Sequence, residues 1–133
     1  MFSIIQKDTI ELDPFTITSS TDAGTAAILT ASGRVRLRGL VMAAGIDHST
    51  TDLTDATVDS HSGSINSVIP TAVAGDLSPA KAQVGYSGGD AGIILEDGES
   101  VYLTLTGGGV DTVSLTVYAR YTALTYNASL QVV

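Results

Sequence analysis

The chain has no cysteine and no tryptophan, and its 133 residues include only two phenylalanines and six lysines and arginines. Without cysteine it cannot form a disulfide framework, a thiolate nucleophile or a cysteine-based zinc site. Against the six basic residues stand 14 acidic ones, which give a formal net charge of −8. Nucleic-acid binding needs a basic footprint, and anionic membrane surfaces attract cations. We therefore expect neither a nucleic acid nor a membrane as a partner.

Two kinds of targeting segment are also missing from the sequence. The start, MFSIIQKDTIELD, has neither the basic region nor the long apolar run of a signal peptide. No stretch reaches the roughly 18 apolar residues of a membrane-spanning helix. Together with the absence of cysteine, this favours a protein made in a cytoplasm.

The residues that are abundant point to β-structure. Hydrophobic residues make up 44% of the chain, and Val, Ile, Leu and Ala account for most of them; Thr and Ser are plentiful, and there are 14 glycines. β-Branched residues with many turn formers are typical of short strands joined by tight turns. The length suits one domain. We expect a single all-β domain over residues 1–133, an antiparallel β-sandwich of about eight strands with jelly-roll topology.

The stretch Gly92–Tyr121 carries the clearest strand pattern. A short apolar run, Ile93–Leu95, precedes a tight turn at Glu96–Glu99, in which Gly98 is expected at positive φ. Alternating apolar and polar residues then occupy 101–106 and again 113–121. The sequence predicts an antiparallel hairpin across this gap, with one face in the core.

The apolar parity near the amino terminus shifts at a proline. Ile10 and Leu12 share one parity, and Phe15 and Ile17 share the other, with Pro14 between them. A shift of one residue at a proline predicts a bulge or an edge strand. Residues 1–8 are interpreted as an arm that could contact a neighbouring subunit.

A second strand, Arg34–Met42, places half of the positive charge of the chain in one row. We expect Val35, Leu37 and Val41 on one face, because strand side chains alternate. The opposite face then carries Arg34, Arg36 and Arg38. An anion could bind this row, but pairing with carboxylates of the sheet or of a partner subunit fits the acidic chain better.

The last ten residues, 124–133, also alternate. Their apolar members are Leu124, Tyr126, Ala128, Leu130 and Val132. A terminal strand of this kind either closes the sheet of its own domain or pairs with a neighbouring subunit. We assign Leu124, Tyr126, Leu130 and Val132 to a candidate interface, with the row of arginines.

The region between residues 43 and 91 looks least ordered and carries both histidines. Its oxygen and imidazole groups are types that bind metals: Asp47, His48, Asp52, Asp55, Asp59 and His61. The spacing matches neither an EF-hand loop nor the HExxH motif. A solvated acidic loop explains the composition best. A calcium site on Asp47, Asp52, Asp55 and Asp59 is the alternative, and no cofactor is expected.

No constellation of catalytic residues is recognisable. The sequence has no GxSxG nucleophile elbow, and the carboxylates Glu96, Asp97 and Glu99 share one turn rather than flanking a cleft. We predict that the protein is not an enzyme. Tyr102 and Tyr118 fall on the outward parity of their strands, where tyrosines suit an interface, a sugar platform or the rim of a core.

The short, acidic, cysteine-free chain with the phrase GIILEDGESVYLTLTGGGVDTVSLTVYARY resembles the small jelly-roll capsid decoration, or cement, proteins of tailed bacteriophages. The resemblance covers the last third of the chain. It implies a homotrimer on the surface of the capsid, made in the host cytoplasm, that bridges subunits of the major capsid protein. The alternative is a carbohydrate- or receptor-binding β-sandwich module of a phage fibre or tail, in which calcium could take part.

Calcium separates these two functions. If the Asp47–Asp59 region is a ligand site, adding calcium should raise the melting temperature, because a ligand that binds only the folded state stabilises it. The structural function predicts a melting curve that calcium leaves unchanged.

Overall fold

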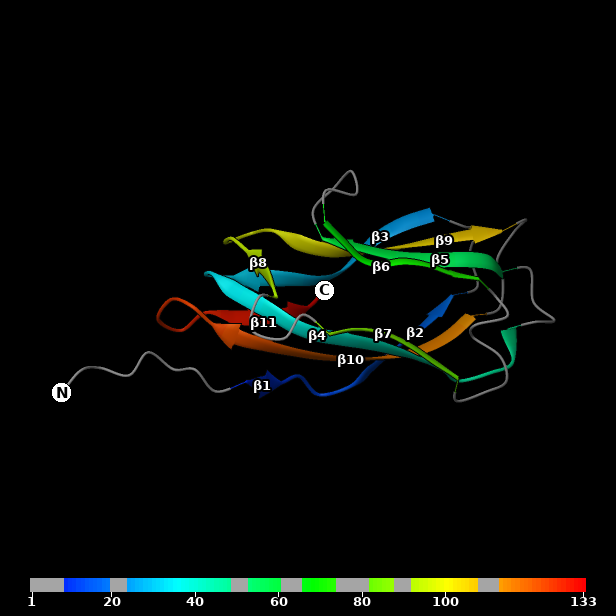
Figure 1. Ribbon diagram of the computed structural model, residues 1–133, viewed down its shortest axis with the longest axis horizontal. Helices are drawn as coiled ribbons and strands as arrows, with labels where there is room; N and C mark the ends of the chain where they lie inside the picture. Colours follow the sequence, from blue (N-terminus) through cyan, green and yellow to red (C-terminus); the bar gives the residue numbers. More distant parts are fainter. Residues whose placement is uncertain are drawn as a thin grey trace.

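The computed structural model describes residues 9–19, 24–48, 53–60, 66–73, 82–87, 92–107 and 113–133. These residues form two antiparallel β-sheets packed face to face, so the expected all-β sandwich is confirmed. Figure 1 shows the two layers, with β3, β9, β5 and β6 of sheet B above β2, β10, β4 and β7 of sheet A.

Sheet A holds six strands. They are β1 (Ile10–Glu11), β2 (Phe15–Ser19), β4 (Val35–Ala44), β7 (Gln83–Ser87), β8 (Ile93–Leu95) and β10 (Val113–Ala123). The strands β10 and β4 lie side by side in the middle. Both β1 and β2 pair with the outer side of β10, and both β7 and β8 pair with the outer side of β4. Each edge of the sheet is therefore one interrupted strand.

Sheet B holds five strands in the order β11-β3-β9-β5-β6. They are β3 (Gly24–Ser32), β5 (Leu53–Ser60), β6 (Asn66–Val73), β9 (Ser100–Gly107) and β11 (Ser129–Val132). The carboxyl-terminal strand β11 pairs with β3 of the same chain, from Ser129 opposite Ser32 to Val132 opposite Leu29. Of the two alternatives for the end of the chain, the structure thus shows closure of its own sheet.

The strand order is that of a jelly roll. One layer contains β2-β10-β4-β7 and the other β3-β9-β5-β6, with β1, β8 and β11 as additions. The chain changes sheets at every connection except those from β1 to β2, from β5 to β6 and from β7 to β8. Two four-stranded layers linked in this way are the arrangement expected for the fold.

The predicted hairpin in the Gly92–Tyr121 stretch is wrong. β9 lies in sheet B between β3 and β5, whereas β10 lies in sheet A between the β1/β2 edge and β4. The chain between them crosses from one layer to the other. Both strands bury alternate residues in the same core, and for that reason their patterns match those of a hairpin.

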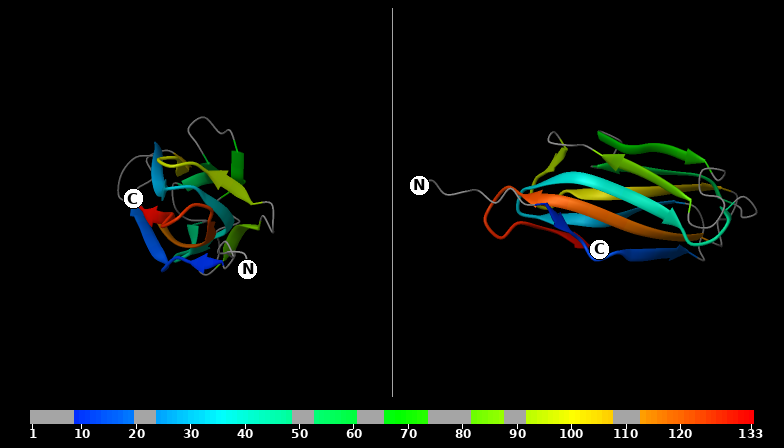
Figure 2. Two further views of the ribbon diagram at one scale, coloured as in Figure 1. Left: turned by 90° about the vertical axis from the view of Figure 1, so that its left-hand side faces the viewer. Right: turned by 60° about the horizontal axis from the view of Figure 1, so that its bottom comes forward.

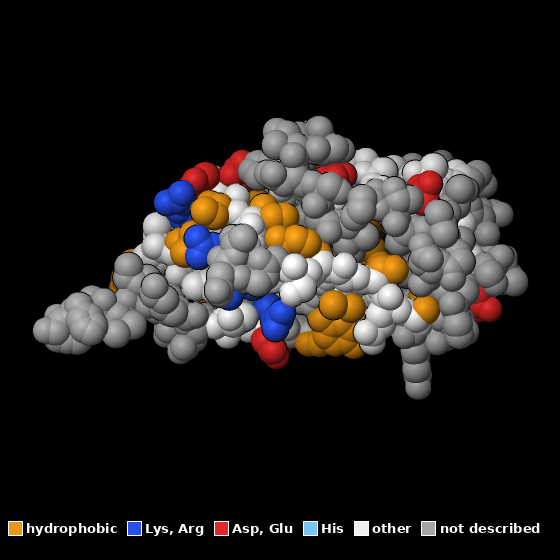
Figure 3. Space-filling model, viewed as in Figure 1, with side chains coloured by type: hydrophobic (Ala, Val, Ile, Leu, Met, Phe, Trp, Pro, Cys, Tyr) orange, Lys and Arg blue, Asp and Glu red, His pale blue; other side chains and the backbone are white. Residues whose placement is uncertain are grey.

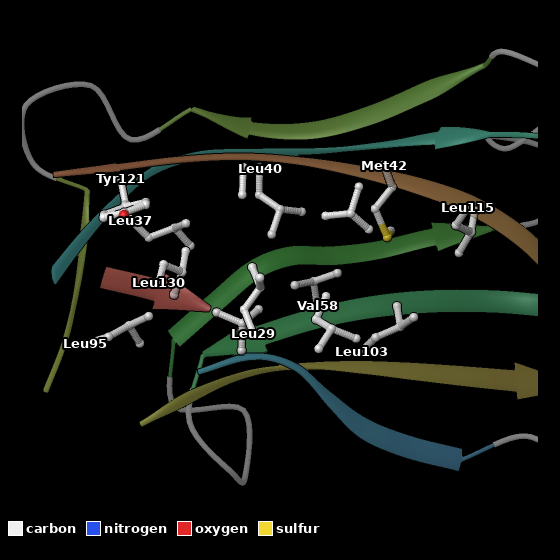
Figure 4. Close-up of a cluster of buried hydrophobic side chains, with 14 of the residues drawn as sticks. Leu29, Leu37, Leu40, Met42, Val58, Leu95, Leu103, Leu115, Tyr121 and Leu130 are labelled. Carbon is white, nitrogen blue, oxygen red and sulfur yellow. The ribbon is translucent and has the colours of Figure 1, made fainter. Parts of the chain in front are cut away.

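The core lies between the sheets. Leu40, Met42 and Leu115 of sheet A point toward Leu29, Val58 and Leu103 of sheet B (Figure 4). All six are at least 97% buried. Burying such a side chain contributes about 1.5–3 kcal/mol, so this layer of aliphatic groups is the main source of stability.

A bulge at Pro14 explains the parity shift in the first strand. Ile10 lies opposite Tyr121 and Phe15 lies opposite Val117, so five residue steps on the edge match four on β10. The extra residue falls in the segment Leu12–Pro14. The expectation of a bulge and an edge strand at this proline is confirmed.

A second bulge, at Arg38, was not expected. Tyr121 pairs with Leu37 and Arg120 pairs with Gly39, which leaves Arg38 as an extra residue of β4. The bulge reverses the parity of everything after it. Leu40 and Met42 are therefore buried, while Val41, which the alternation placed in the core, lies on the outer face opposite Tyr118.

The region that looked least ordered contains three full strands. β5 and β6 pair in sheet B, and β7 pairs with β4 in sheet A. Residues 53–60 are not a solvated acidic loop, because Ala56 and Val58 of β5 are fully buried. The acidic and hydroxyl residues of β5 mask the apolar alternation, so the pattern of the strand is weak in the sequence.

Three segments are tied together at one end of the sandwich. The amide of Gly33 donates to Oδ1 of Asp97 at 2.9 Å, and the amide of Gly98 donates to the carbonyl of Ala31 at 2.9 Å. The amide of Arg34 donates to Oγ1 of Thr125 at 3.0 Å. Gly98 has φ +86°, as the turn predicted, and Gly33 has φ +75°. The β3–β4 connection thus joins the 96–99 turn to the 124–128 segment.

The two glycines allow a matched test. Gly33→Ala should lower the free energy of unfolding by more than about 2 kcal/mol, since its Cβ would add contact strain to the cost of positive φ. That Cβ would lie 2.8 Å from the Cβ of Ala128. Gly98→Ala should cost only about 1 kcal/mol, because a Cβ there meets nothing within 4 Å. Chemical denaturation measures both, and equal losses would contradict the account.

Candidate functional site

The three predicted arginines occupy different environments. Arg34 lies just before β4, and its Nε is 3.2 Å from Oε1 of Glu96, with both side chains about half exposed. Arg36 is half-buried, and its Nε has no hydrogen-bond partner among the residues that the structure describes. Arg38 Nη1 donates to Oγ1 of Thr122 at 3.4 Å. Arg34 therefore pairs with a carboxylate of its own chain and keeps an exposed face.

The predicted metal ligands that the structure describes come from two segments of the chain. Asp55 and Asp59 lie on β5, Asp47 and His48 follow β4, and Asp52 and His61 lie outside the described residues. Within the described ranges, no three His, Cys, Asp or Glu side chains lie close enough to hold a metal ion. Binding of calcium at these aspartates stays a prediction.

His48 has a structural position. It is completely buried, and its Nε2 accepts a hydrogen bond from the backbone amide of Ser114 at 3.2 Å. Ser114 lies near the start of β10, so the histidine joins the end of β4 to the next strand of sheet A. An imidazole enclosed in this way cannot reach a substrate in solvent.

The tail residues divide between core and surface. Leu130 of β11 is 98% buried and Ala128 is buried, so both belong to the core. Tyr126 is 93% exposed in a turn where Asn127 has φ +59°. Val132 is 47% exposed on β11, which is one of the two outer strands of sheet B among the described residues. The uninterrupted strand expected over 124–132 therefore begins only at Ser129.

A groove of about 440 Å³ crosses the outer face of sheet A. It runs over the edge strand, β10, β4 and β7, which face the viewer in the right panel of Figure 2. Its lining residues are Glu11, Leu12, Pro14, Gly39, Leu40, Val41, Tyr86, Ser87, Tyr118, Ala119 and Arg120. In Figure 3, an apolar patch over the middle of β10 lies beside basic and acidic side chains.

Gly39 is the one glycine among the residues that line the groove. Gly39 lies between Arg120 and Ser87 across the sheet, and Gly85 lies beside Val41 in the next row. A Cβ on Gly39 would lie 3.1 Å from Nε and Nη2 of Arg120. Without a side chain on β4 at this point, the guanidinium group lies low over the sheet, and the space between it and the neighbouring rows stays open.

Among the residues that line the groove, Tyr118 was the one predicted from the sequence to lie at a functional surface. Tyr118 was expected on the outer face, and it is 45% exposed there. Arg120 has the same parity two residues later, which is the signal that could have joined it to Tyr118. Glu11 lies opposite Arg120 only because β1 pairs with β10. Such a pairing between the two ends of the chain is not readable from the sequence.

His48 gives a testable consequence. His48→Phe should destabilise the protein by about 1–3 kcal/mol, because the part-buried amide of Ser114 would lose its acceptor. His48→Gln keeps an acceptor at a similar distance from the backbone and should lose less. Thermal melting measures both variants. If the two melt at the same temperature, the hydrogen bond to Ser114 does not matter for stability.

No helix in the described ranges is both long enough and apolar enough to cross a membrane. No protein-family model matches the sequence, and no curated protein matches it. A solved chain from the structure of the infectious bursal disease virus Gx strain is similar at a TM-score of 0.31 and 12% identity. The match covers 94% of this chain and 36% of that chain, so this protein spans about a third of its length. A TM-score of this size carries no argument about function.

Proposed function

We propose that this protein is a non-enzymatic structural protein of a virus particle, which decorates a phage capsid and bridges subunits of the major capsid protein. It acts on the capsid surface as a homotrimer and is made in the host cytoplasm. The proposal rests on the resemblance of the Gly92–Tyr121 phrase to the cement proteins and on the jelly roll that this phrase helps to build. Proteins with a jelly-roll fold have many different functions, so the function has to be inferred from the residues on the surface.

The observation that carries the proposal is the set of exposed apolar side chains before and at the end of β11. Tyr126 is 93% exposed, Val133 is 71% exposed and Val132 is 47% exposed. β11 is also one of the two outer strands of sheet B in the described part of the chain, with β6 at the other side. An outer strand with apolar side chains favours contact with another protein, either by strand addition or by side-chain packing.

The opposite sheet supports the same placement of the interface. The outer edge of sheet A beside β10 is interrupted by Pro14, which lacks an amide hydrogen, and by the bulge next to it. Both features hinder the addition of a further strand. Association through the β11 side of sheet B is therefore easier than association through this edge.

The arginine row supplies a second proposed contact. Arg34 keeps an exposed face while it pairs with Glu96. An exposed ion pair of this kind contributes about 0–1 kcal/mol, so the guanidinium group can exchange Glu96 for a carboxylate of a neighbour at little cost. Arg36 and Arg38 are half-buried and would orient this contact rather than supply most of it.

A double substitution tests the interface. Tyr126→Ser with Val132→Ser should convert the trimer to a monomer and weaken binding to capsids at least tenfold, because it removes exposed apolar area without touching the core. Removing residues 124–133 would be a poorer test, since it also removes the buried Leu130. Light scattering after gel filtration gives the oligomeric state, and co-sedimentation with purified capsids gives the binding.

Tyr118→Ser is the matched control, because it removes an exposed tyrosine from the outer face of the other sheet. It should leave both measurements unchanged. The proposed interface is wrong if the double variant still forms the same oligomer and still sediments with capsids. Mass spectrometry of the native complex should also find the major capsid protein, and a complex without it would count against the proposed function.

A further inference from the structure

The groove on the outer face of sheet A has the size and the mixed lining of a ligand site. Its volume of about 440 Å³ lies within the range of roughly 300–1,000 Å³ that small-molecule sites occupy. The floor and walls are largely apolar, with Pro14, Leu40 and Val41 among the lining residues. The groups that can make specific hydrogen bonds come from Glu11, Ser87, Tyr118 and Arg120.

Tyr118 supplies a flat aromatic surface in this groove. It is 45% exposed on the middle of β10, among side chains that are otherwise small or short, namely Val41 opposite it and Gly85 in the next strand. An aromatic ring has a negative face that attracts the slightly positive C–H groups of a ligand. A sugar ring presents such C–H groups on one side and hydroxyl groups around its edge.

Arg120 and Glu11 supply hydrogen bonds of both kinds next to this ring. They are direct partners across the β1–β10 pairing, and both are exposed. Neither side chain has a hydrogen bond or ion pair with another of the described residues. A guanidinium group donates only and a carboxylate accepts only, and such charged groups form stronger hydrogen bonds than neutral ones. Neighbouring hydroxyls of a sugar both donate and accept, so they suit this pair.

The charge of the site favours a neutral ligand. Arg120 alone would attract an anion, but Glu11 beside it repels one, and the chain as a whole carries a net charge of −8. A cation would meet the reverse conflict at Arg120. An uncharged ligand with many hydroxyl groups can form hydrogen bonds with both side chains and is repelled by neither.

The backbone around the groove argues against a peptide in strand form. β10 is paired on one side with the β1/β2 edge and on the other with β4, and β4 is paired with β7 beyond it. The groove therefore lies over a sheet face whose main-chain groups are already paired. A peptide that binds by strand addition needs a free edge, which this face does not offer.

We propose that the groove binds a neutral oligosaccharide, with one sugar ring stacked on Tyr118 and its hydroxyls hydrogen-bonded to Arg120 and Glu11. This site is separate from the exposed apolar side chains before and at the end of β11 and does not depend on the proposed capsid function. It gives the outer face of sheet A a ligand of its own.

Binding to an array of defined neutral oligosaccharides, built from glucose, galactose, mannose and N-acetylglucosamine, tests the proposal. The full-length protein should bind at least one of them, and calorimetry with that oligosaccharide should show at least a tenfold loss for Tyr118→Ala. Arg120→Ala and Glu11→Gln should each weaken binding several-fold. Tyr118→Phe should keep most of it, because stacking needs only the ring.

Tyr102→Ala is the control, since Tyr102 lies on β9 in the other sheet, outside the groove and outside the proposed interface. It should bind like the unchanged protein, and matching melting curves would show that all variants are folded. The proposal is overturned if no neutral oligosaccharide binds, if only acidic sugars bind, or if Tyr118→Ala binds normally. A change of oligomeric state in Tyr118→Ala would also overturn it, because the groove would then be a protein interface.

Discussion

Neither sheet of this protein can form without the other, because neither is a continuous piece of chain. Of the connections between successive strands, only those from β1 to β2, from β5 to β6 and from β7 to β8 stay within one sheet. After every other connection, the next strand belongs to the opposite sheet. The two inner faces, with Leu40 and Met42 on one side and Leu29 and Leu103 on the other, must therefore be buried together. The groove and the exposed end of β11 are both positioned by this shared core.

The sequence predicted the elements better than their partners. Alternation identified β9 and β10, the parity shift located the bulge at Pro14, and Gly98 adopts the positive φ that its turn required. Alternation reports which side of a strand is buried, but not which sheet the strand joins, and so β9 and β10 looked like a hairpin. The bulge at Arg38 is marked in the sequence only by the glycine that follows it, Gly39, and the alternation treats that glycine as an ordinary position of the strand. The bulge moves Val41 out of the core and Leu40 into it, against a pattern that otherwise seemed regular.

The surface features differ in the same way. Tyr118 could be placed on an outer face from its parity alone, and Arg120 shares that parity. Glu11 joins them through a strand pairing that spans most of the chain, and a side chain on Gly39 would crowd the guanidinium group of Arg120. The aspartates and His48 show the opposite error. Their composition suggested a solvated loop. Instead, β5 is a strand of sheet B whose inward side chains are buried in the core, and His48 is buried and bonded to the amide of Ser114.

The pairing of distant segments also bears on how fast the chain folds. Thr16 and Thr116 bond across neighbouring strands although they are 100 residues apart in sequence. Domains built from such distant pairings fold in milliseconds to seconds. The chain loses the entropy of closing long loops before the stabilising contacts between the strands can form. During that time unpaired strands are open to other chains. With 14 acidic residues against six basic ones, newly made chains repel one another, and this repulsion works against aggregation until the two sheets close.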